Sequence, residues 1–509
     1  MAVICSIYTR LNARRLNEMD YFRAHPEEVQ EKQLARLLEK AADTEFGSSH
    51  GYAGIKTAAE YRKRVPLQTY EDIIPYIERL QKGEKSLLWP GEVKWFAKSS
   101  GTTSTRSKFI PVTTDALEDC HYRGVKDLLA VYTKNRPGTN IFNGKGLVLG
   151  GSHRINDFNK DSLCGDLSAI LIENSPFWAD LFRTPKASVA LLEDFEEKLK
   201  RITELTAGEN VTSISGVPSW FLVLIKQLLQ HTGRNNLLDV WPNLEVFFHG
   251  GISFVPYRDQ FHHFIRGEQM QYMETFNASE GFFGLQDEPS DNDMLLMLDL
   301  GVFYEFIPAE LIDTPDPPVY TVAEVKEGVS YAMIISTNTG LWRYVIGDTI
   351  VFTRLRPHKF TISGRTKSFI NAFGEEVIVD NAEKALAAAC KATGALICEY
   401  TAGPVYAGTG TKGSHEWLIE FEKLPGDLGK FTSVLDEALR KVNSDYDAKR
   451  FKDLNLVLPV VRPVPGGTFY KWLREKNKLG GQNKVPRLAN NREYIDELLR
   501  ISGEQGELK

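Results

Sequence analysis

Three short strand-like segments, each followed by a loop of small residues, constrain the fold of this chain more than any other feature. We predict strands at 211–215, 244–249 and 271–276, with a helix at 219–230 after the first of them. Strands that alternate with helices pair in parallel, and their carboxyl ends then meet at one edge of the sheet. The sequence therefore predicts an α/β fold with mainly parallel sheets and a ligand site at that edge.

The remaining segments predict two domains. Residues 294–352 carry paired short strands with turn signals, which indicate a barrel-like antiparallel layer. After a linker at 354–357, residues 360–509 alternate strands with helices again and are long enough to fold alone. We expect a large N-terminal domain over 1–357 and a small, mobile α+β C-terminal domain over 358–509. Helices are predicted at 26–41, 60–64, 75–80, 115–132, 195–205, 377–391, 431–442 and 469–476.

The composition is that of a soluble globular protein, and it excludes several classes of function. The 509 residues carry a formal net charge of −6, so the whole chain exerts no general attraction on nucleic acid or an anionic membrane. Five scattered cysteines without a Cys-x-x-Cys pair indicate neither a disulfide framework nor a structural zinc site. No apolar run reaches membrane-spanning length, and the N-terminus lacks the order of a secretory signal. We therefore expect a cytoplasmic protein in which any anion site is local.

The loop at 98–108 is the strongest local signal for phosphate binding. Seven of its eleven residues carry hydroxyl groups, Gly101 lies among them, and Lys108 ends the run between strands predicted at 93–96 and 109–112. Such a loop offers backbone N–H groups and hydroxyls to a polyphosphate, with a cation at the rim. Its spacing is not that of a Walker-type phosphate loop. Because serine and threonine also favour turns, a solvated hairpin loop is the alternative.

Two further loops carry groups that suit a nucleotide. The run Phe-Asn-Ala-Ser-Glu at 276–280 combines an aromatic ring, a hydroxyl and a carboxylate at the end of a strand. Phe276 could cover a purine, Ser279 could meet a phosphate, and Glu280 could hold Mg²⁺. Asp348, in a Gly-Asp pair that ends another predicted strand, could accept both ribose hydroxyls. Each carboxylate also has a plainer interpretation, because an exposed glutamate after a turn and a Gly-Asp turn are both common surface features.

The C-terminal part contains two basic segments. Residues 363–367, Ser-Gly-Arg-Thr-Lys, follow the predicted linker at a place that suits a hinge. Residues 480–487 put Lys484 and Arg487 on a glycine-flanked loop. A solvated basic tail is the alternative interpretation of this second segment.

Taken in order, these five motifs resemble the adenylate-forming superfamily, which includes acyl-CoA ligases and peptide-synthetase adenylation domains. More closely, they resemble the Gretchen Hagen family of acyl-acid amido synthetases over essentially the whole chain. Residues 99–113 are similar to the phosphate loop and the strand after it, and 276–280 to the aromatic-Gly-x-Thr-Glu motif. Residues 344–348 resemble the ribose motif, Gly364 and Arg365 the hinge motif, and 482–487 the family's Gln-x-Lys-x-Pro-Arg ending.

The chain departs from these patterns at a few positions. Asn277 replaces a glycine of the superfamily, although a small polar residue can still turn there. Thr105 stands where the family usually has glycine, which would stiffen the phosphate loop. Lys367 agrees with the residues that relatives carry at the hinge.

The resemblance implies an enzyme that uses ATP and Mg²⁺. It would activate a small carboxylic acid as acyl-AMP with release of pyrophosphate, and an amine, expected to be an amino acid, would then attack to form an amide. Lys484 would be catalytic, Glu280 would bind the metal, and the C-terminal domain would rotate about 363–367. The implied nucleotide-binding residues are Ser99, Ser100, Gly101, Thr102, Thr103, Lys108, Phe276, Asn277, Ala278, Ser279, Glu280, Asp348 and Arg365.

The acyl-substrate pocket is predicted beside the first two strand ends, at 216–221 and 249–254. His249, next to Gly250 and Gly251, could orient a substrate group or act as a base. Core packing is the alternative for the aromatic residues here, and a satisfied buried histidine is the alternative for His249. The side chains that could wall a site for an apolar or aromatic acid are Trp220, Phe221 and Phe254.

Two other functions stay open at this point. An acyl-CoA ligase would use the same adenylate and end on a thioester, although no basic channel for coenzyme A is evident. A nucleotide-binding protein without catalysis is the other, and the presence of Glu280, Asp348 and Lys484 argues against it. The identities of the acid and of the amine do not follow from the sequence.

Overall fold

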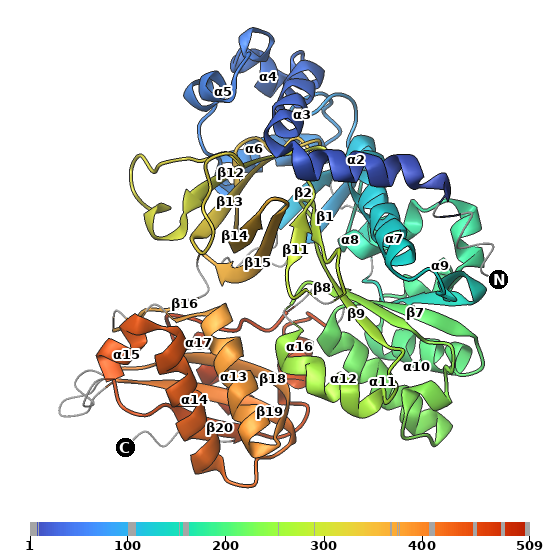
Figure 1. Cartoon of the computed structure of the whole chain (residues 1–509), viewed down its shortest axis with the longest axis vertical. Helices are drawn as coiled ribbons and strands as arrows, with labels where there is room; N and C mark the ends of the chain where they lie inside the picture. The colour runs from blue at the N-terminus through green and yellow to red at the C-terminus, as the bar shows by residue number, and fades with distance from the viewer. Residues whose placement is uncertain are drawn as a thin grey trace. The chain divides into compact units, whose positions relative to one another are not determined.

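The computed structural model of this chain describes residues 8, 10–99, 108–151, 153–155, 162–252, 254–289, 291–366, 369–373, 375, 377–406, 413–450, 456–479 and 484–503. The chain divides into two compact units (Figure 1). The larger contains Met1–Val217, Leu224–Gly251 and Gly267–Thr361, and the smaller contains Pro218–Val223, Ile252–Arg266 and Ile362–Lys509. The sequence places a boundary between residues 357 and 358, which stays a prediction.

The main sheet of the larger unit has the strand order β12-β13-β14-β15-β11-β10-β9-β8-β7-β3-β6. Pairing is parallel from β9 to β6, so the parallel sheet expected from the sequence is confirmed. The strands at the centre of this part, 211–216 and 246–250, are buried over most of their length, as expected for a parallel sheet that is covered on both faces. The parallel strands are β3 (Lys145–Val148), β6 (Arg183–Thr184), β7 (Val211–Gly216), β8 (Val246–Gly250) and β9 (Gln271–Ala278).

The other part of this sheet is antiparallel, as the paired short strands predict. A barrel-like closure of this layer stays a prediction. The linker expected at 354–357 is wrong, because Arg354 and Leu355 end β14 and only residues 356–357 form the turn to β15, its neighbour in the sheet. The strands are β10 (Gly281–Leu285), β11 (Met294–Leu296), β12 (Val302–Pro308), β13 (Ser330–Thr337), β14 (Tyr344–Leu355) and β15 (His358–Arg365).

A second, four-stranded sheet of the larger unit holds the ends of the Ser/Thr-rich loop. β1 (Trp95–Ser99) pairs antiparallel with β2 (Lys108–Val112), so that Ser99 lies opposite Lys108. The two strands expected on either side of the loop are therefore confirmed. β5 (Leu163–Gly165) and β4 (His153–Ile155) complete the sheet.

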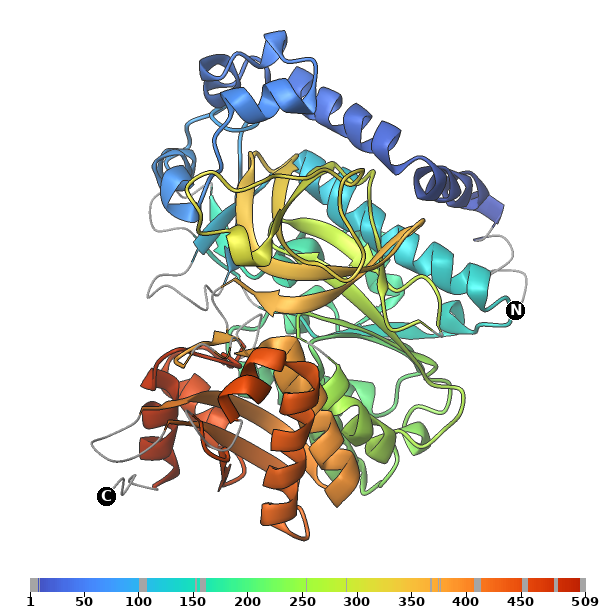
Figure 2. The same ribbon diagram turned by 60° about the vertical axis from the view of Figure 1, so that its left-hand side comes forward.

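Helix α3 (Pro26–Ala41) has the bounds that its apolar spacing predicts. Its buried face packs on β12 (Figure 2), where Gln30 donates hydrogen bonds to the Leu298 and Val302 carbonyls. Helix α6 (Tyr70–Gln81) begins earlier than predicted, because the Asp72 carboxylate accepts the Thr69 N–H at 2.7 Å and caps its first turn. The other principal helices are α2 (Ala13–Ala24), α4 (Glu45–Ser49), α5 (Ala58–Arg64), α7 (Arg123–Asn135), α8 (Leu167–Glu173), α9 (Ala187–Ala190), α10 (Phe195–Thr206) and α11 (Pro218–Thr232).

The smaller unit packs helices on a three-stranded sheet, β18 (Leu396–Val405), β19 (Ser414–Lys423) and β20 (Val460–Val464). Its core surrounds the fully buried Trp417 and Phe431. A segment from the middle of the chain belongs to it, with η6 (Val255–Tyr257) and α12 (Arg258–Phe264). The remaining elements are β16 (Phe369–Ile370), β17 (Val377–Ile378), α13 (Val379–Thr393), α14 (Leu428–Val442), α15 (Ser444–Arg450), α16 (Thr468–Glu475) and α17 (Glu493–Ser502).

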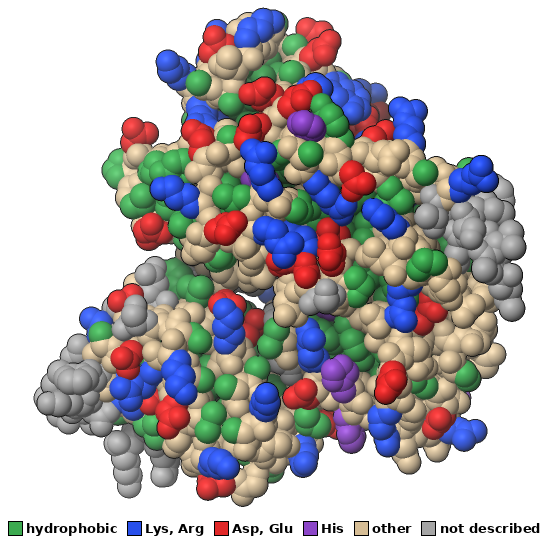
Figure 3. All heavy atoms as spheres, in the orientation of Figure 1, with side chains coloured by type: hydrophobic (Ala, Val, Ile, Leu, Met, Phe, Trp, Pro, Cys, Tyr) green, Lys and Arg blue, Asp and Glu red, His purple; other side chains and the backbone are tan. Residues whose placement is uncertain are grey.

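The charged side chains follow the expectation from net charge. On the face drawn in Figure 3, Lys and Arg are interspersed with Asp and Glu over both units. Among the described helices, none combines the length and the apolar character needed to cross a bilayer.

Candidate active site

The ends of β7, β8 and β9 lie side by side at one edge of the main sheet. Gly216 pairs with His249, and Gly250 pairs with Thr275. The Thr275 hydroxyl donates to the His249 carbonyl at 3.2 Å. A Cβ atom on Gly250 would lie 2.4 Å from the Thr275 carbonyl oxygen, so glycine is required by this close approach. The structure therefore brings three of the predicted loops together.

The turn between β9 and β10 buries the two polar residues expected to meet phosphate and metal. Ser279 and Glu280 are 2% and 6% exposed. The Ser279 hydroxyl has no hydrogen-bond partner among the described residues. Buried hydroxyls are normally hydrogen-bonded, so one without a partner indicates a place that a ligand atom or ordered water would fill.

Phe276 is buried near the same turn. Its ring centroid lies 5.1 Å from that of Phe283, in an edge-on arrangement, and 6.2 Å from that of Phe360. Much of the ring therefore packs against the sheet. Its contact with adenine stays a prediction.

Asn277 is held by a residue that the sequence analysis missed. Its Oδ1 atom lies 2.9 Å from Nδ1 of His121, an arrangement in which the ring N–H donates to the amide oxygen. Burial lowers the pKa of His121 to about 4, so the ring is neutral at physiological pH. Within the described part of the chain, its Nε2 atom also has no partner.

The local structure around His121 is itself unusual. His121 lies in the π-helix η2 (Ala116–Tyr122), which precedes α7 where the sequence predicts one regular helix. Such π-helical turns occur mostly at functional sites. A lone histidine on an apolar helix face carries no motif, so only the fold could reveal its role.

Lys108, the last residue of the Ser/Thr-rich loop, lies beside Tyr344, the first residue of the predicted ribose motif. Lys108 Nζ lies 3.4 Å from the Tyr344 hydroxyl and 5.4 Å from the centroid of the Tyr70 ring. Of the predicted loop residues, Ser100, Gly101, Thr102 and Thr103 lie outside the described residues, as does Lys367 of the hinge; for Ser99 only the backbone is described, in β1.

Asp348 lies within a strand and not, as the Gly-Asp pair suggests, at its end. Ala332 pairs with Thr349 and Ile334 pairs with Val345, so residues 346–348 form a bulge opposite a single residue of β13. Gly347 has a φ of 91°, which permits this geometry. Pairing with β13 continues on both sides of the bulge, at 344–345 and at 349–351. Bulges re-aim side chains, and the predicted ribose contact of Asp348 stays a prediction.

The residues predicted to form the acyl pocket belong to different units. His249, Gly250 and Gly251 belong to the larger one. The aromatic residues expected to wall the pocket belong to the smaller one, and each is buried: Trp220, Phe221 and Phe254.

The described part of the C-terminal basic segment, 484–487, is mostly buried. Lys484 is half-buried, and residues 485–489 that follow it are buried. Arg487 forms an ion pair with Glu399, and Tyr257 donates to the same carboxylate at 2.8 Å. Burial alone would lower the pKa of Arg487, but the carboxylate raises it well above its usual value. The solvated-tail interpretation is therefore wrong for Arg487. Arg365 ends β15.

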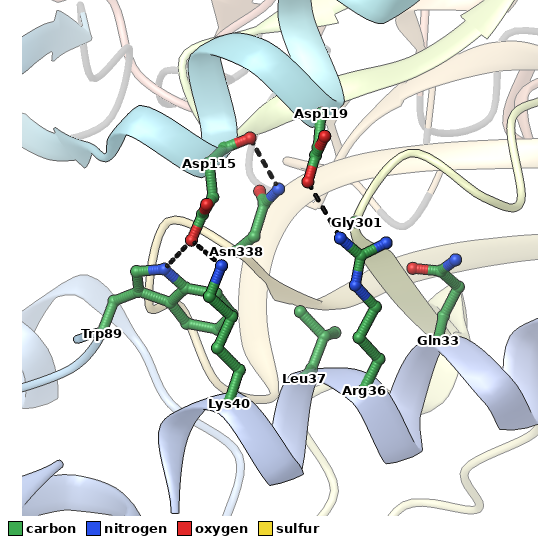
Figure 4. Close-up of a pocket in the computed structure, with 9 residues that line it drawn as sticks. All are labelled: Gln33, Arg36, Leu37, Lys40, Trp89, Asp115, Asp119, Gly301 and Asn338. Carbon is green, nitrogen blue, oxygen red and sulfur yellow. Dashed lines mark hydrogen bonds and ion pairs between the residues drawn. The ribbon is translucent and has the colours of Figure 1, made fainter. Parts of the chain in front are cut away.

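A small pocket in the larger unit holds none of these residues. Helix α3 lines it with Arg36 and Lys40, whose side chains point toward Asp119 and Asp115 (Figure 4). The two ion pairs, at 3.0 and 2.6 Å, hold α3 against the start of η2. This pocket therefore lies outside the predicted site, between α3 and η2.

The described side chains could bind Mg²⁺ only together with a phosphate group. Over the described residues, no group of three or more His, Cys, Asp or Glu side chains could hold a metal ion. Mg²⁺ commonly binds through one or two carboxylates together with substrate phosphates and water. Glu280 suits that mode, because it is buried in the β9–β10 turn beside Ser279, whose hydroxyl has no partner among the described residues.

Comparisons with known proteins agree with this reading. In sequence, the chain is 24% identical to indole-3-acetic acid-amido synthetase GH3.8 of Oryza sativa subsp. indica, over 94% of this chain and 90% of that protein. It is 23% identical to indole-3-acetic acid-amido synthetase GH3.3 of Arabidopsis thaliana, over 91% and 89%.

Solved structures share the fold. A GH3.15 acyl acid amido synthetase superposes with a TM-score of 0.78 at 19% identity, over 95% of both chains. A 2-hydroxyisobutyryl-CoA ligase in complex with 2-HIB-AMP superposes with a TM-score of 0.61 at 12% identity, over 95% of this chain and 93% of that one. The mixed α/β architecture of adenylate-forming ligases is therefore confirmed.

The family assignment rests on three segments. Residues 15–270 match the GH3 family N-terminal domain, 295–365 the GH3 family central domain, and 380–493 the GH3 family C-terminal domain. The first of these segments alone is half of the chain, and the resemblance that the motifs indicated is confirmed. The chain belongs to the GH3 family.

Proposed function

We propose that this chain is an ATP-dependent acyl-acid amido synthetase. It forms an acyl adenylate with release of pyrophosphate and then transfers the acyl group to the amine of an amino acid. The observation that carries the proposal is the buried Ser279–Glu280 pair, whose serine hydroxyl lacks a partner within the described structure, at the edge where β7, β8 and β9 end. Family membership and the names of the relatives support the same reaction.

The chemistry explains why such a site is needed. A carboxylate is a poor electrophile, and AMP transfer turns it into a mixed anhydride that an amine can attack. Both reactants carry negative charge, so donors at 99–103, Lys108 and the Ser279 hydroxyl would offset their repulsion. Mg²⁺ bound by Glu280 would neutralise charge on the phosphates. Asp348 would hold the ribose and Phe276 would face the adenine.

Lys484 is proposed as the catalytic cation of the adenylation step. It would meet the substrate carboxylate and the α-phosphate while the acyl adenylate forms. Rotation of the predicted C-terminal domain, 358–509, about 363–367, with Arg365 near the nucleotide, would then withdraw Lys484 and complete the site for amine attack.

The acid is proposed to be apolar or aromatic. Two of the relatives described above are named for indole-3-acetic acid, and one solved GH3.15 structure is a complex with 2,4-DB. Trp220, Phe221 and Phe254 would supply apolar walls, with His249 orienting a polar group. Because the reaction consumes ATP and an amino acid, we place it in the cytoplasm.

ATP–pyrophosphate exchange over a panel of aromatic, indolic, fatty and amino acids tests the proposal. We expect exchange with a subset of acids and a hydroxamate when hydroxylamine traps the adenylate. Glu280→Gln should lower exchange about 10²-fold or more, because it removes the carboxylate from a preorganised charge site. Glu288→Gln, at an exposed position after the same hairpin, is the control and should leave exchange unchanged. Exchange that survives in E280Q would contradict the role of Glu280.

A coenzyme A ligase is the second candidate, and the fold shared with 2-hydroxyisobutyryl-CoA ligase favours keeping it in view. The two reactions share the adenylate and differ in the acceptor. Incubation of the activated acid with amino acids and, separately, with coenzyme A should yield an amide only. A thioester would favour the ligase, and ATP binding by calorimetry without exchange for any acid would favour a non-catalytic nucleotide-binding protein.

A further inference from the structure

The guanidinium of Arg487 is buried in the smaller unit and is held on several sides at once. It forms an ion pair with Glu399 and donates to the Tyr400 carbonyl at 3.1 Å. It also donates to the Tyr257 hydroxyl at 2.5 Å, and that hydroxyl donates in turn to Glu399 at 2.8 Å. Its Cζ atom lies 4.7 Å from the centroid of the Tyr400 ring. We call Arg487, Glu399 and Tyr257 the arginine clamp.

The backbone around Arg487 is fixed as firmly as its side chain. The Ala402 N–H donates to the Arg487 carbonyl at 2.8 Å, and the Ala489 N–H donates to the Ala402 carbonyl at 3.1 Å. The Thr401 hydroxyl donates to the Pro486 carbonyl at 2.7 Å. These contacts bind the segment after Lys484 to strand β18. Lys484 is only three residues from Arg487, a span of at most about 10 Å in extended chain.

Tyr257 enters this cluster from a distant part of the sequence. It lies in η6, within the segment 252–266 that directly follows Gly250 and Gly251. The same segment is anchored a second time, because the buried Gln260 amide donates to the Ile397 carbonyl. Figure 1 shows α12 beside β18, with which it is in contact. The clamp therefore links the region that follows one predicted substrate loop to the segment that carries Lys484.

We propose that the arginine clamp is a positioning device for Lys484. Tyr257 fixes the side chain of Arg487, and the segment that carries both Arg487 and the catalytic lysine is thereby held in place. This inference rests on the proposed function, since the role of Lys484 belongs to it. Loss of the Tyr257 hydroxyl would leave Arg487 and Glu399 paired but free to reorient, and Lys484 would spend less time in its reactive position. The rate of adenylation would fall while the affinity for ATP stayed the same.

The test uses Tyr257→Phe in the full-length protein, because removing Arg487 would leave the largely buried Glu399 carboxylate without its counter-charge and can unfold the unit. We expect kcat for ATP–pyrophosphate exchange to fall about 10-fold, equal to 1.4 kcal/mol, with KM for ATP unchanged. In a Lys484→Ala background the same substitution should have no further effect, since there is no lysine left to position.

The chain offers a matched control. Tyr446, also buried in the smaller unit, donates to Asp436 at 2.7 Å, and Arg450 donates to the same carboxylate at 2.7 Å. Tyr446→Phe therefore removes a comparable hydroxyl from a comparable arginine–carboxylate pair, and it should leave exchange unchanged. Equal effects of Y257F and Y446F, or multiplicative effects of Y257F and K484A, would overturn the clamp as a positioning device.

A second readout separates this inference from the proposed function. Hydrogen exchange of the amides at 484–489 should quicken in Y257F and not in Y446F, whether or not the acid has been identified. If the wild-type chain showed no ATP–pyrophosphate exchange with any acid, the proposed function would be overturned. Faster amide exchange would then still support the clamp, and unchanged amide exchange would overturn it.

Discussion

The β9–β10 turn and the arginine clamp are both buried polar clusters, yet they differ in how completely their hydrogen bonds are satisfied. In the turn, the Ser279 hydroxyl is buried without a partner in the described structure, and so is the nearby Nε2 of His121. In the clamp, the Arg487 guanidinium meets a carboxylate, a carbonyl, a hydroxyl and an aromatic ring. The hydrogen bonds of the clamp are therefore complete without a ligand. The turn makes sense when a ligand supplies the missing atoms.

Truncating a side chain should therefore lower the unfolding free energy in the clamp and raise it in the turn. The clamp should show the largest change. Arg487→Met leaves the largely buried Glu399 carboxylate without its counter-charge, so we expect the unfolding free energy to fall by roughly 3–5 kcal/mol. Urea unfolding followed by tryptophan fluorescence reports this, because Trp417 lies in the core of the same unit.

Arg500→Met is the matched control for the clamp. Arg500 pairs with Glu475 at 2.9 Å, but both side chains are largely exposed, so its loss should cost less than about 1 kcal/mol. If R487M lost no more stability than R500M, the clamp would be no firmer than a surface ion pair, and the contrast between the two clusters would disappear.

His121 gives the next largest effect, through pH. Its folded-state pKa of about 4 is below the usual 6.5, so below pH 6.5 the unfolded chain takes up a proton that the folded chain refuses. The stability contributed by the neutral ring is complete above pH 6.5 and is lost as the pH falls toward 4. The full difference is roughly 3 kcal/mol.

The measurement compares urea unfolding of the wild type and of His121→Gln at pH 7 and pH 4.5. Glutamine cannot take up the proton, so H121Q should lose less stability between the two pH values than the wild type. The other titratable groups are shared by the two proteins and cancel in the difference. Parallel losses would mean that His121 is protonated in the folded protein, and the turn would then be less closed than the structure implies.

The sequence predicts best where one local pattern decides the structure. Helix α3 and the strands β7, β8 and β9 follow from apolar spacing alone. Asp348 shows the limit, because a Gly-Asp pair signals a turn locally, while pairing with β13 on both sides makes it a bulge. The ion-pair partner of Arg487 lies 88 residues away and its hydroxyl partner 230 residues away, so no local pattern could distinguish it from a solvated tail residue.

Ser279→Ala is the smallest of these changes and the sharpest test of the unsatisfied turn. Removing a buried hydroxyl that has no partner relieves its desolvation cost, so the unfolding free energy should rise by roughly 1 kcal/mol. A hydrogen bond to a charged phosphate would be lost at the same time, and exchange activity should fall about tenfold or more. Ser414→Ala is the control, because that buried serine already donates to the Leu458 carbonyl at 3.0 Å and its loss should cost stability. If S279A also lost stability, the hydroxyl would have a partner in the folded protein, and the turn would resemble the clamp after all.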